Sequence, residues 1–278
     1  AFISGYVYAL YTIKKEEFPK FYLNKMRRLG LPLLSASLLF LIIANIIGTG
    51  YSRPWNEIVT IYLFSYAHFW YLQASLLIFL LMSILGYLEI IKTKKAALIM
   101  LGVAIMVNAL PLSEVSVFSF NGFVYILPFF LTGMIIKRYY GSLCRYRGVA
   151  VGLSAFLMSI IILAYAEHID LPVSMERNTV PMIVVSIVLC VTLFAMSFKN
   201  TYLAWLGGYS YAIYLFHFSQ SGMRIGLEKS GVELPSIMVF LACMIAGLAV
   251  PIAMEWVFRK NRYLNFVFLG NRLRAKGS

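Results

Sequence analysis

Long runs of apolar residues, separated by short polar segments, repeat along the whole chain. A helix that crosses the hydrocarbon core of a membrane needs about 20 predominantly apolar residues. The runs predict membrane spans at residues 29–48, 69–91, 96–112, 122–136, 148–166, 178–197, 202–220 and 236–258. Residues 1–12 read as the end of a further span, whereas the run 58–67 is too short to cross and predicts an interfacial or re-entrant segment. The pattern predicts an all-α, polytopic transmembrane helix bundle with about eight full spans and one partial N-terminal span.

The composition agrees with a membrane protein and leaves no room for a soluble domain. Of the 278 residues, 61% are hydrophobic and 13% are charged, and the mean hydropathy is +0.82. Soluble domains are about half apolar and about a quarter charged. We therefore expect residues 1–278 to form a single membrane-embedded domain. Because Ala1 already lies inside an apolar run, we also expect this domain to be N-terminally incomplete, with its first helix missing.

The basic residues alternate with the predicted spans. If the partial first span runs from outside to inside, the cytoplasmic segments are 13–28, 92–95, 137–147, 198–201 and 259–278. These segments hold all but four of the 24 Lys and Arg residues, and most acidic residues lie in the other loops. Cytoplasmic loops collect Lys and Arg. The sequence therefore predicts a multi-pass protein of the cell membrane whose C-terminus is cytoplasmic.

The net charge of +13 is thus mainly a signal of topology. Basic loops beside a membrane contact anionic headgroups, so membrane lipids are expected partners. The basic residues are scattered among loops and not gathered in one domain, which argues against nucleic acid as a partner. The cysteines (Cys144, Cys190 and Cys243) have no paired spacing, so neither a disulfide framework nor a metal site is expected. The sequence leaves the oligomeric state open, a homo-oligomer included.

The three histidines lie at or beyond the predicted outer ends of spans. Ionisable groups at membrane depth are costly and usually face a polar cavity, and imidazole is well suited to move protons near neutral pH. His217 and His68 are therefore candidate catalytic residues. Structural roles stay open for both: a hydrogen bond within the bundle for His217, and a place in an aromatic belt for His68. His168 reads as a solvated loop residue.

The stretch GGYSYAIYLFHF, residues 207–218, sets polar groups inside an apolar run. Lipid offers such groups no hydrogen-bond partner, so we expect them to line an aqueous or substrate-filled cavity. The expected substrate-binding residues here are Tyr209, Ser210, Tyr211 and Tyr214. Tyrosines near a span end also serve as interfacial anchors. A role as interfacial anchors explains Tyr209 and Tyr211, but it does not explain His217.

Further polar residues stand near the ends of other spans. Ser4, Trp70 and Gln73 are additional candidates for substrate binding, although small polar residues also serve ordinary helix packing in membranes. Arg27 and Arg28 abut the membrane in the segment 13–28. They mark either a positive-inside loop with an interfacial helix or a site where guanidinium groups hold a phosphate.

One acidic residue, Glu255, lies well inside an apolar run. Arg259 follows one helical turn later, which is the spacing of an ion pair on a helix. We therefore expect the two residues to form a structural pair.

Taken in chain order, these segments resemble the integral-membrane acyltransferase family 3. The likeness rests on AFISGYVYAL, NKMRRLGLPLL, AHFWYLQASL, FFLTGMIIKR and LGGYSYAIYLFH, followed by a late glutamate at Glu255. Order, spacing and predicted topology agree over essentially the whole chain. The chain departs from the family at its start, because the family's catalytic Arg and His lie on a helix just before the SG pair. The RRLGLP form is similar to the branch that acts on surface polysaccharides and lipid-linked sugars.

The resemblance implies acyl transfer, with acetyl as the usual group, from acyl-CoA (acetyl-CoA) in the cytoplasm to a carbohydrate hydroxyl at the outer face. It also implies a location in the bacterial inner (plasma) membrane, where a histidine acts as general base without a metal. A transporter or flippase of a lipid-linked saccharide predicts the same topology and the same polar cavity. A scaffold subunit that needs a partner chain for catalysis is a third alternative.

Overall fold

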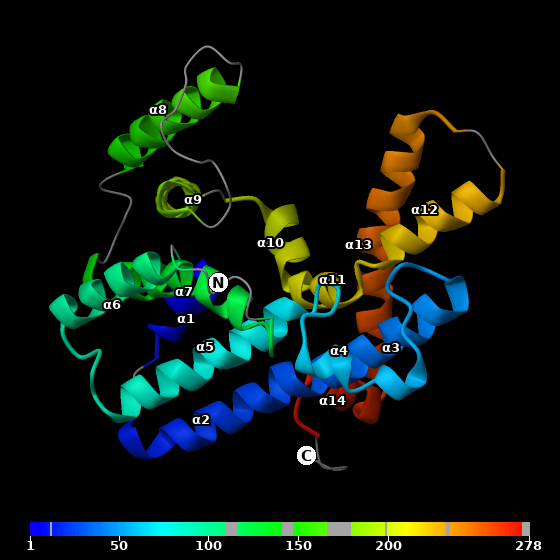
Figure 1. Ribbon diagram of the computed structural model, residues 1–278, viewed down its shortest axis with the longest axis horizontal. Helices are drawn as coiled ribbons and strands as arrows, with labels where there is room; N and C mark the ends of the chain where they lie inside the picture. The colour runs from blue at the N-terminus through cyan, green and yellow to red at the C-terminus, as the bar shows by residue number, and fades with distance from the viewer. Residues whose placement is uncertain are drawn as a thin grey trace. The chain divides into compact units, whose positions relative to one another are not determined.

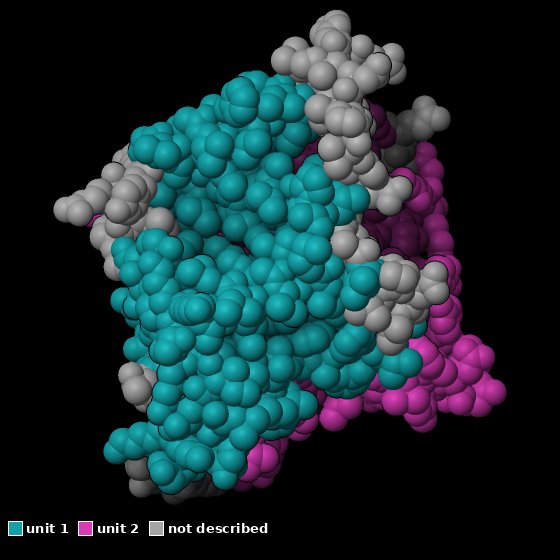
Figure 2. All heavy atoms as spheres, turned by 60° about the vertical axis from the view of Figure 1, so that its left-hand side comes forward, with its two compact units in different colours: residues 1–22, 77–198 teal, residues 23–76, 199–278 magenta. Residues whose placement is uncertain are grey.

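The computed structural model describes residues 1–11, 13–108, 110, 116–140, 147–165, 179–197, 199–231 and 234–273 (Figure 1). Every regular element within these ranges is a helix, as the sequence predicts. The chain divides into two compact units, which Figure 2 colours separately. Unit 1 comprises residues 1–22 and 77–198, and unit 2 comprises residues 23–76 and 199–278. Two helices contribute to both units: α2 (Phe18–Lys25) and α5 (Trp70–Tyr87).

Unit 1 is organised around α7. Its helices are α1 (Phe2–Tyr8), α6 (Lys94–Val107), α7 (Phe120–Ile135), α8 (Arg147–Tyr165) and α9 (Val180–Met196). Helices α1 and α6 both pack on α7, and α8 pairs with α9 (Figure 1). A π-helical turn, Ile136–Tyr140, extends α7 and carries basic residues at its start.

The contact between α1 and α7 depends on two glycines. A Cβ added at Gly5 would lie 1.9 Å from the carbonyl oxygen of Phe130, and one added at Gly133 would lie 2.0 Å from the carbonyl oxygen of Phe2. Small residues allow membrane helices to approach at backbone distance. The SG pair near the start of the chain and the FFLTG stretch of α7 are thus two halves of one helix contact.

Unit 2 is organised around the long helix α13. Its helices are α3 (Leu31–Ile47), α4 (Thr60–Leu63), α10 (Thr201–Gly208), α11 (Ser210–Phe216), α12 (Ser219–Lys229), α13 (Ser236–Lys260) and α14 (Arg262–Leu269). Helices α11, α12 and α14 contact α13, and α14 also packs on α3 (Figure 1). A π-helical turn, Met26–Gly30, joins α2 to α3, so much of the segment predicted as a basic loop is helical. Gly48 ends α3 in the left-handed conformation that glycine adopts readily.

Four helices of the described ranges are long and apolar enough to cross a membrane. They are Lys15–Ile47, Trp70–Tyr87, Phe120–Tyr140 and Ser236–Lys260. Each overlaps one predicted span, although the first begins well before the span predicted at 29–48. Two further predicted spans correspond to shorter apolar helices, Gly148–Ile161 and Val180–Met196. The total of eight full spans therefore stays a prediction.

The predicted span 202–220 does not form one helix. The structure breaks it into α10, α11 and the start of α12, with changes of direction at Tyr209 and at His217–Phe218. Gly207 and Gly208 precede the first break, and glycine weakens a helix by about 1 kcal/mol relative to alanine. The run is apolar enough for a span, but its backbone is not continuous. The breaks bring polar side chains of this stretch toward the site described next.

Candidate active site

A cavity of about 400 Å³ lies within unit 2. Its walls come from the end of α3, the loop after it, the residues just before α5, and the turn from α11 into α12. His68 and His217 both line this cavity. The structure therefore brings together the two histidines that the sequence singled out.

The two imidazoles are neighbours. Their ring centroids lie 4.4 Å apart with an interplanar angle of 59°. Nε2 of His68 lies 3.2 Å from the carbonyl oxygen of Leu215, and Nδ1 of His217 lies 2.9 Å from the carbonyl oxygen of Tyr214. A carbonyl oxygen only accepts, so each of these nitrogens carries the proton in the neutral ring. The unprotonated nitrogens are then Nδ1 of His68 and Nε2 of His217.

Burial acts strongly on His68, which lies in the loop before α5 and outside the candidate spans. Desolvation lowers the pKa of His68 to about 4, and the nearby His217 adds to this effect, while the hydrogen bond to Leu215 opposes it. Phe69 and Phe40 supply much of the apolar surroundings, with ring centroids 4.1 Å and 5.8 Å from that of His68. At neutral pH His68 is therefore uncharged and able to accept a hydrogen bond.

Tyr214 forms a hydrogen bond with each of the two histidines. Its hydroxyl donates to the carbonyl oxygen of His68 over 2.5 Å, and its own carbonyl oxygen accepts from His217. One residue of α11 thereby holds the backbone of one histidine and sets the tautomer of the other. The role in substrate binding that the sequence predicts for Tyr214 stays a prediction, and in this structure its hydroxyl contacts the backbone of His68.

The backbone beside His68 is strained. Ala67, which also lines the cavity, has φ of 46°. A residue with a Cβ in the left-handed region costs about 1–2 kcal/mol. Strain of this kind concentrates at functional sites, where the surrounding structure enforces it.

Besides Thr49 and Tyr51, three polar residues that line the cavity are not among those predicted from the sequence. They are Ser219, Gln220 and Ser221, which follow the histidine turn and begin α12. The hydroxyl of Ser219 donates to the carbonyl oxygen of Ala246 over 2.9 Å, which connects α12 to α13. Their position directly after FHF was the signal that could have found them, because the polar run continues there.

The predicted anion-binding arginines take part in contacts between helices. Nε of Arg27 donates to the carbonyl oxygen of Gly270 over 3.1 Å, and the carbonyl oxygen of Arg28 accepts from the hydroxyl of Tyr211 over 2.6 Å. Gly270 lies so close that an added Cβ would be 2.6 Å from the carbonyl oxygen of Arg27. The π-turn is thus attached both to α11 and to the end of α14.

Three other predicted site residues, Gln73, Tyr209 and Ser210, do not line the histidine cavity. Gln73 is 1% exposed and donates to the carbonyl oxygens of Tyr62 and Phe64, which fixes α4 against α5. Tyr209 packs on Trp205 with ring centroids 5.2 Å apart, and the exposed Ser210 begins α11.

Two further candidates belong to the starts of helices. Trp70 begins α5 and meets Tyr71 edge-to-face, with ring centroids 6.0 Å apart. Ser4 lies on α1, in unit 1, whereas all the other site candidates are in unit 2.

The ion pair expected on α13 is present. Glu255 is 5% exposed and pairs with Arg259, whose side chain is more than half exposed. His168 lies outside the described residues. Within the described part of the chain, no three His, Cys, Asp or Glu side chains gather closely enough to hold a metal ion.

Comparison with known families matches residues 1–256 to the acyltransferase domain of the acyltransferase 3 family. No curated protein and no solved structure matches the chain significantly. The family match includes all five motif stretches and both histidines of the cavity.

Proposed function

This chain belongs to the acyltransferase 3 family, and we propose that it moves an acyl group, in the simplest case acetyl, from acyl-CoA to a carbohydrate hydroxyl. The family and the apolar helices together make it a membrane acyltransferase. The donor, the acceptor and the catalytic residues belong to the proposal. The observation that carries it is the pair of His68 and His217 at the cavity of unit 2.

In the proposed reaction, Nε2 of His217 takes the proton of the acceptor hydroxyl. The oxygen attacks the carbonyl carbon of the thioester and forms the new C–O bond. Collapse of the tetrahedral intermediate breaks the C–S bond, and the leaving thiolate takes the proton back from His217 as free thiol. The products are an ester and CoA, and no oxidant or reductant is needed. General-base catalysis of this kind contributes about 10²–10⁴-fold.

The tautomer supports this assignment for His217. With Nδ1 donating to Tyr214, the lone pair of the ring is on Nε2. His68, held neutral by burial, does not repel the imidazolium that forms beside it. Tyr214 contacts both histidines: its hydroxyl donates to the carbonyl oxygen of His68, and its carbonyl oxygen accepts from Nδ1 of His217.

The charge pattern supports a division of the two substrates between the membrane faces. Basic segments are expected at the cytoplasmic face, where the phosphates of CoA would arrive, and both histidines stand near predicted outer ends of spans. We propose that the protein lies in the bacterial plasma membrane with a cytoplasmic C-terminus. The acceptor would be a surface polysaccharide or a lipid-linked sugar.

The test is transfer of label from radiolabelled acetyl-CoA to a cell-envelope carbohydrate extract, with the protein in nanodiscs. We expect transfer by the parent protein and loss of transfer in His217→Gln at unchanged folding. Saccharide translocation without label transfer or acetyl-CoA hydrolysis would contradict the proposal and favour a flippase. Transfer that appears only when a co-purifying protein is added would favour a scaffold subunit.

A further inference from the structure

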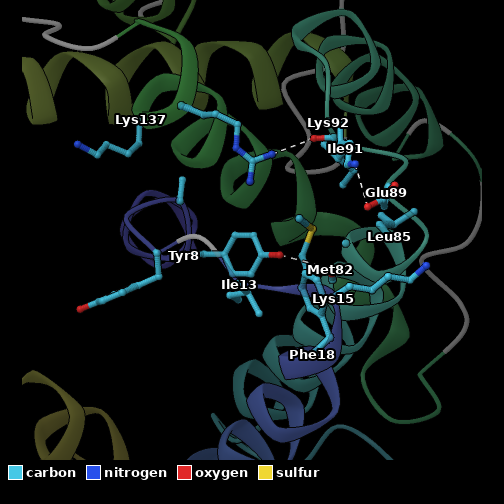
Figure 3. Close-up of a pocket in the computed structure, with 14 residues that line it drawn as sticks. Tyr8, Ile13, Lys15, Phe18, Met82, Leu85, Glu89, Ile91, Lys92 and Lys137 are labelled. Atoms are coloured by element: carbon cyan, nitrogen blue, oxygen red, sulfur yellow. Dashed lines mark hydrogen bonds and ion pairs between the residues drawn. The ribbon is translucent and has the colours of Figure 1, made fainter.

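A second cavity, of about 470 Å³, lies within unit 1 and takes no part in the proposed chemistry (Figure 3). It opens between the end of α1, the turn before α2, the end of α5 and the π-turn after α7. Four basic residues line it, namely Lys15, Lys92, Lys137 and Arg138. Glu89 is the one acidic residue among the described residues of its lining. The cavity is therefore suited to an anion.

Polar and apolar side chains both line this cavity. Figure 3 shows the ring of Tyr8 in its middle, with the hydroxyl directed toward Met82, to whose carbonyl oxygen it donates over 3.4 Å. Phe18 lies so close to Gly86 that an added Cβ there would be 2.2 Å from the ring. A ligand with a charged part and a less polar part fits such a site, because basic and apolar side chains line it together.

The basic rim is built by contacts between distant segments. Nη1 of Arg138 donates to the carbonyl oxygen of Ile91 over 2.9 Å, and the hydroxyl of Tyr139 donates to the carbonyl oxygen of Lys92 over 3.2 Å. Two successive residues of the π-turn thus hold the backbone that follows α5. A guanidinium anchored through one of its five N–H groups keeps donors for a phosphate.

The carboxylate of Glu89 does not cancel the positive charge. It pairs with Lys92 at 2.8 Å, in a pair whose two side chains are 49% and 65% exposed. Exposed pairs of this kind are weak, because solvent screens both charges. Lys15 also lowers the pKa of the Glu89 carboxyl, more weakly than Lys92 does, whereas Lys137 and Arg138 remain without this acidic counterpart. Several cations around one cavity create a positive electrostatic potential, which attracts multiply charged anions.

We propose that this cavity binds the phosphate groups of a phosphate ester, and that the ester is the acyl-CoA donor, an assignment that rests on the proposed function. The basic residues come from segments 13–28, 92–95 and 137–147, all of which the charge pattern predicts to be cytoplasmic. The fold gathers these three segments around one cavity, so CoA would meet them together. The phosphate site predicted at Arg27 and Arg28 lies in unit 2 and is a separate prediction.

The test measures CoA binding to the protein in nanodiscs of neutral lipid by calorimetry. We expect Arg138→Gln and Lys15→Gln each to weaken binding by about tenfold, since each change removes a cation that would donate a charge-assisted hydrogen bond to a phosphate. Glu89→Gln should strengthen binding severalfold, a gain that misfolding cannot produce. Lys95→Gln, an exposed lysine outside the cavity, is the matched control and should leave CoA binding unchanged. Equal affinity in all four variants would overturn the assignment.

Two further readouts separate the possible failures. In transfer assays, Lys15→Gln should raise KM for acetyl-CoA and leave kcat nearly intact, whereas His217→Gln should bind CoA normally and lose turnover. If the variants change CoA affinity as expected but no acyl transfer is detected, the proposed function is refuted and the CoA site is retained. If the variants instead change retention of phosphatidylglycerol and not CoA affinity, the phosphate belongs to a lipid headgroup and the donor assignment is wrong.

Discussion

The imidazole rings of His68 and His217 lie with their centroids 4.4 Å apart at the edge of one cavity. One precedes α5 and the other ends α11, so only the fold makes them neighbours. Each ring donates to a backbone carbonyl oxygen, which leaves one basic nitrogen on each. This pair is where we propose that the proton transfer takes place, and burial keeps the His68 ring neutral.

Replacing His217 with Gln should lower the rate of acyl transfer by about 10²–10⁴-fold, because the proposed general base is lost. The amide retains polar groups of similar size, so the bundle should stay folded. Label transfer from acetyl-CoA measures the rate, and thermal unfolding in detergent checks the fold. A variant that is active and folded would show that His217 has a structural role.

Replacing Tyr214 with Phe removes the hydroxyl that donates to His68 and keeps the ring. We expect a loss of about 1 kcal/mol in the free energy of unfolding. Because the histidines lose their fixed geometry, kcat should fall and its pH profile should shift, with KM for the acceptor little changed. Tyr202→Phe, at an 84% exposed position, is the matched control. An unshifted pH profile would contradict a positioning role for Tyr214.

Acidification should destabilise the protein through His68. Its pKa in the folded state is about 4, below the ordinary value of 6.5, so the unfolded chain binds the proton more readily. The stabilising contribution is complete above pH 6.5 and is lost as the pH falls toward 4, by up to about 3 kcal/mol. Unfolding temperatures of parent and His68→Gln, measured between pH 7 and 4, test this. The variant should lose part of the pH dependence, and identical profiles would rule out His68 as its source.

Replacing Gly133 with Ala should force α1 and α7 apart. The new Cβ would lie 2.0 Å from the carbonyl oxygen of Phe2, and overpacking of this kind costs about 1–3 kcal/mol. Gly102→Ala on α6 is the matched control, because no atom lies within 4 Å of a Cβ there. Thermal unfolding in detergent should show a lower midpoint for the first variant alone. Equal midpoints would mean that the close approach of α1 and α7 does not stabilise unit 1.

The histidines, the Glu255–Arg259 pair and the family were accessible from the sequence because their signals are local. An apolar run of the right length predicts a helix by itself, and residues four apart on a helix meet whatever surrounds them. The family motifs are short stretches that can be read one at a time. The alternation of basic segments likewise needs only their order along the chain.

The tertiary structure alone decided which of these segments meet. The backbone breaks around Tyr209 and His217 turn a predicted span into a cavity wall, and Tyr214 contacts a residue far away in the chain. Arg138 and Ile91, like Gly5 and Phe130, are in contact because helices pack, and no periodicity of the chain contains that information. Helix formation depends on hydrogen bonds between near neighbours, whereas a site depends on side chains brought together from distant segments. The sequence by itself therefore determined most of the helices and the residue types of the chemistry, and the fold determined where a helix breaks and which residues meet.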